Sequence, residues 1–299
     1  MSIFLFSWYY IKKTVIRRGT TVIYLLLAII SSALVSLMMR LSTDKVKGNI
    51  AMLVVNYFVC MCLAAGFAGF GSIMPERSGL GQTMGLGALN GVLYLASFVL
   101  FQLNVKKNGV VLASTFMKLG LLVPMVLSIF LFGEIPGVVQ IIGFALAIIA
   151  ILMINLEKDA GGRGFKFGLV LLLLCGGAAD AMSKVFEEVG NAELSQQFLL
   201  YTFVTALILC LCLMAYKKQK IGKNEIIYGA LIGIPNFFSA KFLLKSLESV
   251  DAVIAYPTFS VATILVVTLV GVLAFKEKLG KRQWTALCII LAALVLLNV

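Results

Sequence analysis

Residues 132–155 read FGEIPGVVQIIGFALAIIAILMIN, and residues 275–298 read FKEKLGKRQWTALCIILAALVLLN. Each stretch opens on Phe-x-Glu and then runs through apolar residues to a closing Asn. The polar positions match at an offset of 143 residues: Gly137 with Gly280, Gln140 with Gln283, and Asn155 with Asn298. Apolar runs of this kind are typical of membrane-spanning helices, so a membrane-embedded unit is predicted to occur twice in the chain.

Nearly the same offset relates other parts of the two halves. The matched positions are Thr115-Phe116 with Thr258-Phe259, Gly87 and Gly91 with Gly229 and Gly233, Ser97 with Ser239, Arg40 with Lys184, and Tyr57 with Tyr201. Because the offset stays almost constant and the matches include polar residues, they indicate an internal repeat. The glycine pairs are four residues apart, and we interpret them as close helix packing between the repeats.

Composition favours lipid as the solvent for much of the surface. Hydrophobic residues make up 61% of the chain and charged residues 13%, against about 45–50% and about 25% in soluble domains. A spanning helix needs roughly 17–25 mostly apolar residues, and about ten stretches qualify. The predicted spans are residues 21–39, 50–70, 84–104, 109–132, 137–155, 167–185, 196–215, 226–245, 250–274 and 283–298.

The predicted fold is an all-α membrane protein of about ten transmembrane helices, built as two inverted five-helix repeats. The inversion follows from the odd number of helices in each copy, because the second copy then enters the membrane from the opposite side. Such inverted repeats are associated with secondary transporters and alternating access. The predicted organisation is an interfacial segment 1–20, a first repeat 21–156, a linker 157–166 and a second repeat 167–299.

Several kinds of chemistry lack their usual residues. The chain has no histidine, its six cysteines all lie in apolar stretches, and no Gly-x-x-x-x-Gly-Lys-Ser/Thr phosphate loop occurs. We therefore expect no metal, no cofactor and no enzymatic activity, and energy from a gradient instead of ATP. The net charge of +12 is spread over short runs between apolar stretches. Such runs favour lipid headgroups over nucleic acid as a partner.

The charged residues do not decide on which side of the membrane the termini lie. The loops around Lys45, Lys217 and Lys278 are rich in cations and their repeat mates are not, so the positive-inside rule puts these loops in the cytoplasm and both termini outside. The N-terminal cations of residues 12–18 argue for the reverse.

Two strings resemble the end of an EamA domain, found in carriers of the drug/metabolite transporter superfamily. They are Leu131-Phe132-Gly133-Glu134 and Phe275-Lys276-Glu277-Lys278-Leu279, each followed by an apolar run to Asn. The resemblance covers nearly the whole chain and implies two inverted five-helix repeats. It implies a cavity lined by the first, third, fourth, sixth, eighth and ninth helices, and cytoplasmic termini. Members carry amino acids, nucleotide-type metabolites, sugars or lipophilic cations.

The same strings, with Ser183-Lys184-Val185-Phe186-Glu187, are similar to small multidrug resistance proteins, which are half-sized relatives. The membrane-embedded Glu of their first helix has no match here, because alignment on Lys184 puts Gly176 at that position. This departure puts proton-coupled export of lipophilic cations by that route in doubt.

Two charged residues lie deep inside predicted spans, where a charge costs about 2.5–3.5 kcal/mol on insertion scales. Lys118 is near the middle of span 109–132, and its repeat mate is Val261. We predict that it binds an anionic group such as a substrate carboxylate; a structural pair with a buried acid is the alternative. Asp180 is the acid well inside a span, and we predict that it holds a substrate ammonium or a coupling proton. Its alternative is an i,i+4 pair with Lys184.

Further polar residues complete the predicted substrate-binding site. They are Lys241, Asn90, Tyr94, Asn236, Tyr256 and Thr258. Lys241 has the alternative of reaching the membrane interface, and the neutral residues that of hydrogen bonds between helices. Glu134 and Glu277 stand at helix junctions, where we expect them to cap the turn or accept backbone donors from the next helix.

These features predict a multi-pass transporter of the plasma membrane that exports small metabolites such as amino acids by alternating access. A lipid or lipid-linked sugar flippase, a non-transporting membrane scaffold and an intramembrane enzyme are the alternatives. The expected partners are a small-molecule substrate and the lipid bilayer. Proton coupling, and the choice between a monomer and a homodimer, stay open.

Overall fold

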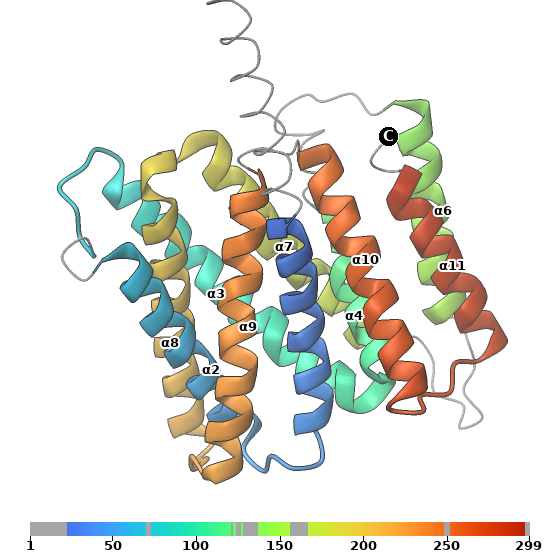
Figure 1. Ribbon diagram of the computed structural model, residues 1–299, viewed down its shortest axis with the longest axis horizontal. Coiled ribbons are helices and arrows are strands. Elements are labelled where there is room, and N and C mark those ends of the chain that lie inside the picture. Colours follow the sequence, from blue (N-terminus) through green and yellow to red (C-terminus); the bar gives the residue numbers. More distant parts are fainter. Residues whose placement is uncertain are drawn as a thin grey trace, which may run out of the picture.

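The computed structural model describes residues 23–69, 73–120, 122–123, 127, 137–155, 167–247 and 252–296. Within these residues the regular secondary structure is helical throughout, and the helices stand side by side as a bundle (Figure 1). The predicted all-helical class is therefore confirmed. The predicted interfacial segment 1–20 and linker 157–166 lie outside the described residues.

Each described helix falls within, or overlaps, a predicted apolar span. The helices are Ile23–Ser42, α2 Asn49–Ala68, α3 Leu80–Asn108, α4 Val110–Leu119, α6 Val138–Asn155, α7 Phe167–Val189, α8 Ser195–Tyr216, α9 Lys223–Leu247, α10 Ala252–Leu273 and α11 Lys281–Leu296, with a 3-10 turn, η2, at Ala192–Leu194. Among the described residues, six helices are long and apolar enough to cross a membrane. The chain is a multi-helix membrane protein, and the count of ten spans stays a prediction.

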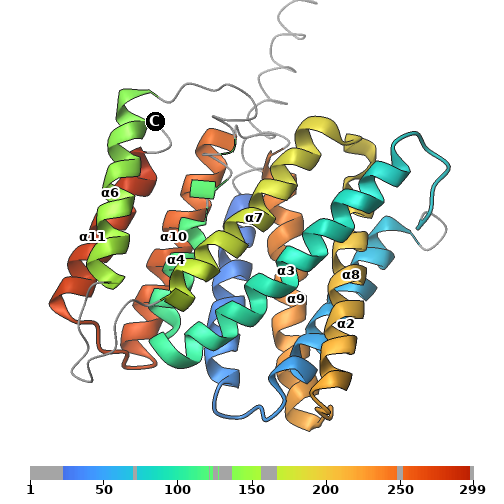
Figure 2. The same cartoon turned by 180° about the vertical axis from the view of Figure 1, so that it is seen from behind.

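Helix α3 is longer than its predicted span of 84–104. It has 29 residues, which at 1.5 Å per residue corresponds to roughly 43 Å, more than the ~30 Å of a hydrocarbon core. A helix of that length must tilt, and α3 runs obliquely across the bundle (Figure 2). It ends at Gly109, whose φ of 85° suits glycine. Hydropathy missed the outer turns because Lys106 and Lys107 are polar yet helical.

Helix α4 is shorter than its predicted span of 109–132. Its last helical residue is Leu119, and the N–H of Gly120 donates to the Met117 carbonyl at 3.3 Å in a tighter turn. Helix α4 thus ends directly after Leu119, within the predicted span, and residues 121, 124–126 and 128–132 lie outside the described residues. This ending places Lys118 in the last turn of α4, near carbonyl groups that favour a cation.

Helices that the repeat matches contact each other in pairs: α2 with α8, α4 with α10, and α6 with α11. The pair α2 and α8 is antiparallel. Gln219, after α8, accepts the N–H of Ile50 in the first turn of α2 at 2.9 Å, whereas Tyr201, near the start of α8, donates to Ile73, after α2, at 2.7 Å. The predicted inverted repeat requires antiparallel mates, and the repeat itself stays a prediction.

The matched glycines lie at two equivalent helix crossings, α3 on α8 and α9 on α2. A Cβ atom added to Gly91 would lie 2.6 Å from the Thr202 carbonyl oxygen, and one added to Gly233 would lie 2.7 Å from that of Asn56. Backbone atoms at these distances leave no room for a methyl group. The predicted packing role of these glycines is therefore confirmed.

Glu277 caps a helix, but not the one expected. Its carboxylate accepts the N–H groups of Val110 at 2.8 Å and Val111 at 3.2 Å, so it caps α4 from the connection between α10 and α11. The prediction of a backbone-accepting Glu277 is confirmed, while the partner is α4 and not the next helix. Sequence spacing could not reveal a contact across 167 residues. Glu134 lies outside the described residues.

One end of the bundle gathers most of the described cations. Glu225 accepts the N–H of Lys47 at 3.0 Å, and the Glu277 carboxylate lies 3.7 Å from Nε of Arg40, so these connections meet at the same end (Figure 1). The cations on this cation-rich face are Arg40, Lys45, Lys47, Lys106, Lys107, Lys217, Lys218, Lys220, Lys223, Lys276, Lys278, Lys281 and Arg282. The described cations towards the opposite end are Arg77, Lys184, Lys241 and Lys245.

Candidate functional site

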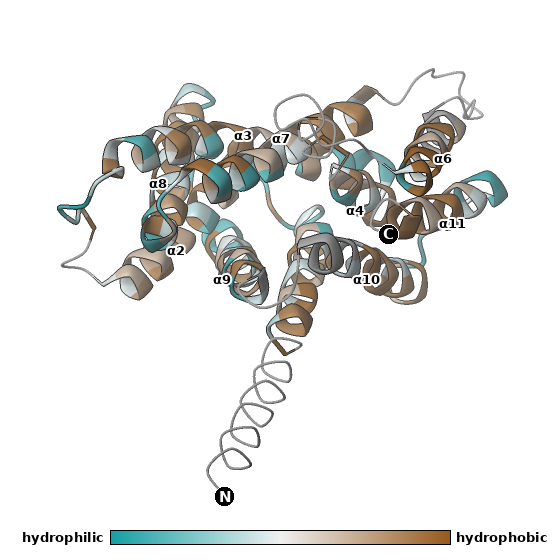
Figure 3. Ribbon diagram, turned by 90° about the horizontal axis from the view of Figure 1, so that it is seen from above, coloured by the Kyte–Doolittle hydropathy of each residue, from teal (hydrophilic) through white to brown (hydrophobic). Residues whose placement is uncertain are grey.

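A cavity of about 130 Å³ lies in the interior of the bundle. Its lining comes from helix Ile23–Ser42 and from α3, α4, α7, α8, α9 and α10. Seen from above, α3, α7 and α4 lie in one row and α9 and α10 in a second row that faces it (Figure 3). Since one water needs about 10–15 Å³ of such space, the cavity has room for on the order of ten waters or one small solute. The six helices named by the family resemblance all contribute, and α8 is an addition.

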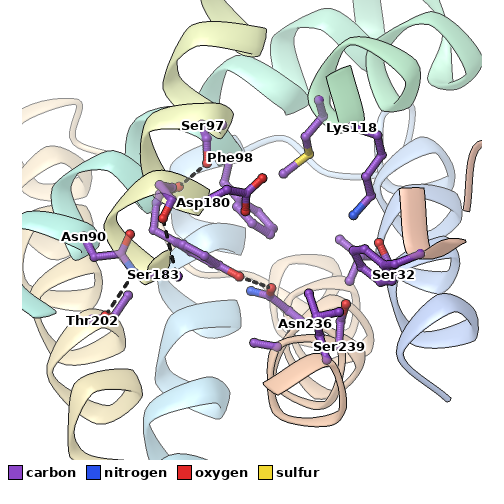
Figure 4. A pocket seen from close by; sticks show the side chains of 18 of the residues that line it. Ser32, Asn90, Ser97, Phe98, Lys118, Asp180, Ser183, Thr202, Asn236 and Ser239 are labelled. Carbon is purple, nitrogen blue, oxygen red and sulfur yellow. Dashed lines mark hydrogen bonds between the residues drawn. The ribbon is translucent and has the colours of Figure 1, made fainter. Parts of the chain in front are cut away.

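Lys118 and Asp180 both line this cavity (Figure 4). The ammonium of Lys118 lies 3.9 Å from the ring centroid of Phe259 on α10. Asp180 lies within α7, yet its side chain is exposed because it faces the cavity. In the described part of the chain, no ion pair within 4.0 Å joins Asp180 to Lys118 or to Lys184. Two opposite charges therefore face one hollow without direct contact between them.

A chain of amide and hydroxyl groups forms the polar wall of the cavity. Tyr94 donates to Oδ1 of Asn236 at 3.3 Å, and Nδ2 of Asn236 donates to Oδ1 of Asn56 at 3.2 Å. Nδ2 of Asn90 donates to Thr202 at 3.4 Å, while Oδ1 of Asn90 is buried without a hydrogen-bond partner. An unsatisfied buried acceptor costs about 1–3 kcal/mol.

Hydroxyl groups form a part of the site that sequence reasoning missed. The cavity-lining serines are Ser32, Ser36, Ser97, Ser114, Ser183 and Ser239. Serines in spans are easily dismissed because they bond their own helix, as Ser97 does to the Tyr94 carbonyl at 2.9 Å. The signal was helical spacing: Ser114 is four residues from Lys118, and Ser183 is three from Asp180, so each shares a face with a charge.

Aromatic rings support this polar wall. The rings of Tyr94 and Phe98 stack with centroids 5.4 Å apart, and Phe203 meets Tyr94 edge-on at 5.7 Å. All three residues line the cavity, as do Leu243 and Leu244 of α9. The cavity thus combines charges and hydroxyl groups with apolar surface, which suits a small amphiphilic solute.

Two predicted site residues are not brought into this cavity. Lys241 lies 2.8 Å from the ring centroid of Phe67, on the α2 side of α9. Thr258 is exposed and its neighbour Phe259 lines the cavity instead. Successive helical residues point about 100° apart, so adjacent positions face different surroundings. The side chain of Tyr256 lies outside what the structure describes. Lys118, Asp180, Asn90, Tyr94 and Asn236 are brought together as predicted.

Known proteins resemble the chain in sequence and in fold. The family model described as "EamA-like transporter family" matches residues 19–156 and 166–299. An "Uncharacterized protein" of Haemophilus influenzae is 24% identical over 210 residues, covering 68% of this chain and 72% of that protein. A solved structure described as "Crystal structure of protein" has a TM-score of 0.58 at 17% identity, covering 93% of this chain and 96% of that one. At that identity the structure shows a shared fold.

Proposed function

We propose that this chain, which belongs to the EamA-like transporter family of the drug/metabolite transporter superfamily, carries small zwitterions such as amino acids across the membrane by alternating access. The observation that carries the proposal is the pair of opposite charges, Lys118 and Asp180, that line one cavity without an ion pair between them. The family membership confirms the resemblance predicted from the repeated strings at residues 131–134 and 275–279.

Charge complementarity selects the substrate class. The Lys118 ammonium contacts the aromatic face of Phe259, and Asp180 has no hydrogen-bond or ion-pair partner within 4.0 Å among the described residues. A carboxylate that reaches Lys118 and an ammonium that reaches Asp180 would form charge-assisted hydrogen bonds, each worth about 1.5–3 kcal/mol. A solute with one charge leaves the other residue uncompensated. The site therefore favours zwitterions over simple acids, amines and sugars.

Alternating access is supported by the way the halves meet. The matched helices α2 and α8 are antiparallel, and Glu277 beyond α10 caps the start of its mate α4. Two halves related in this way enclose a cavity that can open to either face in turn. On the family resemblance we propose the plasma membrane as the location and export as the direction.

A thermal-shift screen of the purified protein tests the substrate class. Amino acids are compared with matched acids and amines that lack one charge, and with nucleosides, sugars and lipophilic cations. At 100 times its Kd a ligand stabilises the folded protein by about 2.7 kcal/mol, which corresponds to a rise of about 5–10 °C in Tm. We expect that rise for zwitterions and little for the single-charge analogues.

Two variants assign the charges. In Asp180→Asn, an amino acid and the matched acid that lacks the amine should raise Tm by the same amount. In Lys118→Met, an amino acid and the matched amine that lacks the carboxylate should raise Tm by the same amount. Lys245→Met, on α9 outside the cavity lining, should behave as the wild type. Stabilisation that ignores ligand charge, or that survives both cavity variants unchanged, contradicts the proposal.

A further inference from the structure

Two glycines form the closest approach between α4 and α7, the helices that carry the two cavity charges. A Cβ atom on Gly177 would overlap the carbonyl oxygen of Gly120 and would lie 2.5 Å from Cγ2 of Val123. A Cβ atom on Gly120 would lie 2.7 Å from the backbone N of Gly177. Backbone atoms cannot rotate away as a side chain can, so any side chain at either glycine separates the helices.

The crossing lies within one helical turn of both charges. Lys118 is two residues before Gly120, and Asp180 is three residues after Gly177. The chain is also held tightly there, because the N–H of Val123 donates to the Gly120 carbonyl at 2.8 Å. A change in the distance between the two helices at this crossing would therefore change the distance between Lys118 and Asp180 by nearly the same amount.

The other half of the chain lacks both features. At the offsets that relate the halves, Gly120 corresponds to Thr263 and Gly177 to Ala33, while Lys118 corresponds to Val261 and Asp180 to Ser36. The matching positions in the other half, which lack the charges, thus carry side chains, whereas the crossing of α4 and α7 has none. Ala33 is buried at its position, so burial alone does not require a glycine there.

We infer that Gly120 and Gly177 are positioning residues that fix the distance between Lys118 and Asp180, and so determine the length of zwitterion that the cavity binds. The inference rests on the proposed function. In this inference the distance between α4 and α7 selects among zwitterions, in addition to the groups that contact the substrate. A wider crossing should favour a solute whose ammonium and carboxylate are further apart.

A ladder of unbranched zwitterions tests this inference: glycine, β-alanine, γ-aminobutyrate and 5-aminovalerate. Kd values are measured for the wild type, Gly177→Ala and Gly85→Ala. The control glycine lies on α3, where an added Cβ meets nothing within 4 Å. We expect Gly177→Ala to move the preferred length to a longer member, changing the affinity ratio of neighbouring members about tenfold. Gly85→Ala should keep the wild-type order.

A compensating variant separates positioning from general damage. The double variant Gly177→Ala/Asp180→Glu adds one methylene to the acid and should restore the wild-type order, which a merely destabilised protein would not do. If Gly177→Ala does not fold, Gly120→Ala replaces it. If neither folds, Asp180→Glu alone must move the preferred length to a shorter member.

The inference is overturned if the folded glycine variants keep the wild-type order of Kd values across the ladder. It is also overturned if Asp180→Glu, when that variant is used, keeps this order. Either result leaves the proposed function intact. A wild-type protein that binds no member of the ladder and no other zwitterion overturns the proposed function, and the inference with it. The two failures are thus distinguishable by the wild-type measurement.

Discussion

The ammonium of Lys118 lies 3.9 Å from the centroid of the Phe259 ring and forms no ion pair within 4.0 Å in the described part of the chain. An aromatic face attracts a cation by about 0.5–2 kcal/mol, less than a paired and desolvated carboxylate provides. The ring therefore contacts Lys118 more weakly than a paired carboxylate would. In the proposed function, a substrate carboxylate would compete with Phe259 for the ammonium.

This competition predicts the behaviour of Phe259→Leu, which keeps an apolar side chain but removes the aromatic face. The unliganded protein should melt about 1–8 °C lower, because up to about 2 kcal/mol of attraction is lost. The rise in Tm on adding a zwitterion should be larger than in the wild type. Phe259→Tyr keeps the ring and should match the wild type in both measurements; equal ligand-induced rises in all three proteins would contradict the competition.

The glycine crossing of α3 on α8 predicts a sharp difference between two substitutions on one helix. Gly91→Ala places a methyl group 2.6 Å from the Thr202 carbonyl oxygen, whereas Gly85→Ala places it in open space. Overpacking costs about 1–3 kcal/mol, so Gly91→Ala should lower Tm by about 2–10 °C. Gly85→Ala should leave Tm unchanged or raise it, because alanine favours the helix. A similar Tm for both variants would refute the close crossing.

The cap on α4 predicts that Glu277 matters more than an exposed acid. Glu277→Ala removes the acceptor of the N–H groups of Val110 and Val111, a loss of about 0.5–2 kcal/mol or roughly 1–8 °C in Tm. Glu193→Ala removes a partner of Arg77 from an exposed pair, which contributes about 0–1 kcal/mol. Measured in the same detergent, a smaller loss for Glu277→Ala than for Glu193→Ala would contradict the capping role.

The cation-rich face predicts the orientation of the protein. Cations next to spanning helices favour the cytoplasm, so Lys278→Cys should be protected from a membrane-impermeant maleimide in intact cells. Ser78→Cys, in the connection between α2 and α3 at the opposite end, should be labelled above the level of the parent protein. Both should react after permeabilisation. The reverse pattern would place the termini in the cytoplasm, as the family resemblance implies.

Much of the fold could be predicted because each long apolar run must become a helix in lipid. What hydropathy could not locate were helix ends, since it averages over neighbours. It stopped α3 before Lys106 although the helix continues to Asn108, and it ran through Gly120 although α4 stops there. Glu277 was recognised as a backbone acceptor, but its partner depends on a tertiary contact that no local pattern contains.

Sequence reasoning could predict those residues of the candidate site whose charge is energetically costly in lipid. Lys118 and Asp180 stood out for that reason, and both line the cavity. Lys241 was predicted for the site as well, with reach to the membrane interface as its alternative, yet it lies against Phe67, because one helix alone does not reveal which of its faces meets the cavity. The serines are inexpensive in a helix, so nothing in composition marked them, and among them Ser114 and Ser183 could have been connected to the site by their spacing from Lys118 and Asp180.

Counterflow in proteoliposomes tests the central claim most directly. The purified protein is reconstituted with an excess of unlabelled zwitterion inside, and uptake of the labelled zwitterion is followed for the wild type, Lys118→Ala and Lys245→Ala. The account predicts transient accumulation for the wild type and Lys245→Ala, and none for Lys118→Ala, with all three equally folded and inserted. Accumulation by Lys118→Ala at the wild-type rate would contradict it.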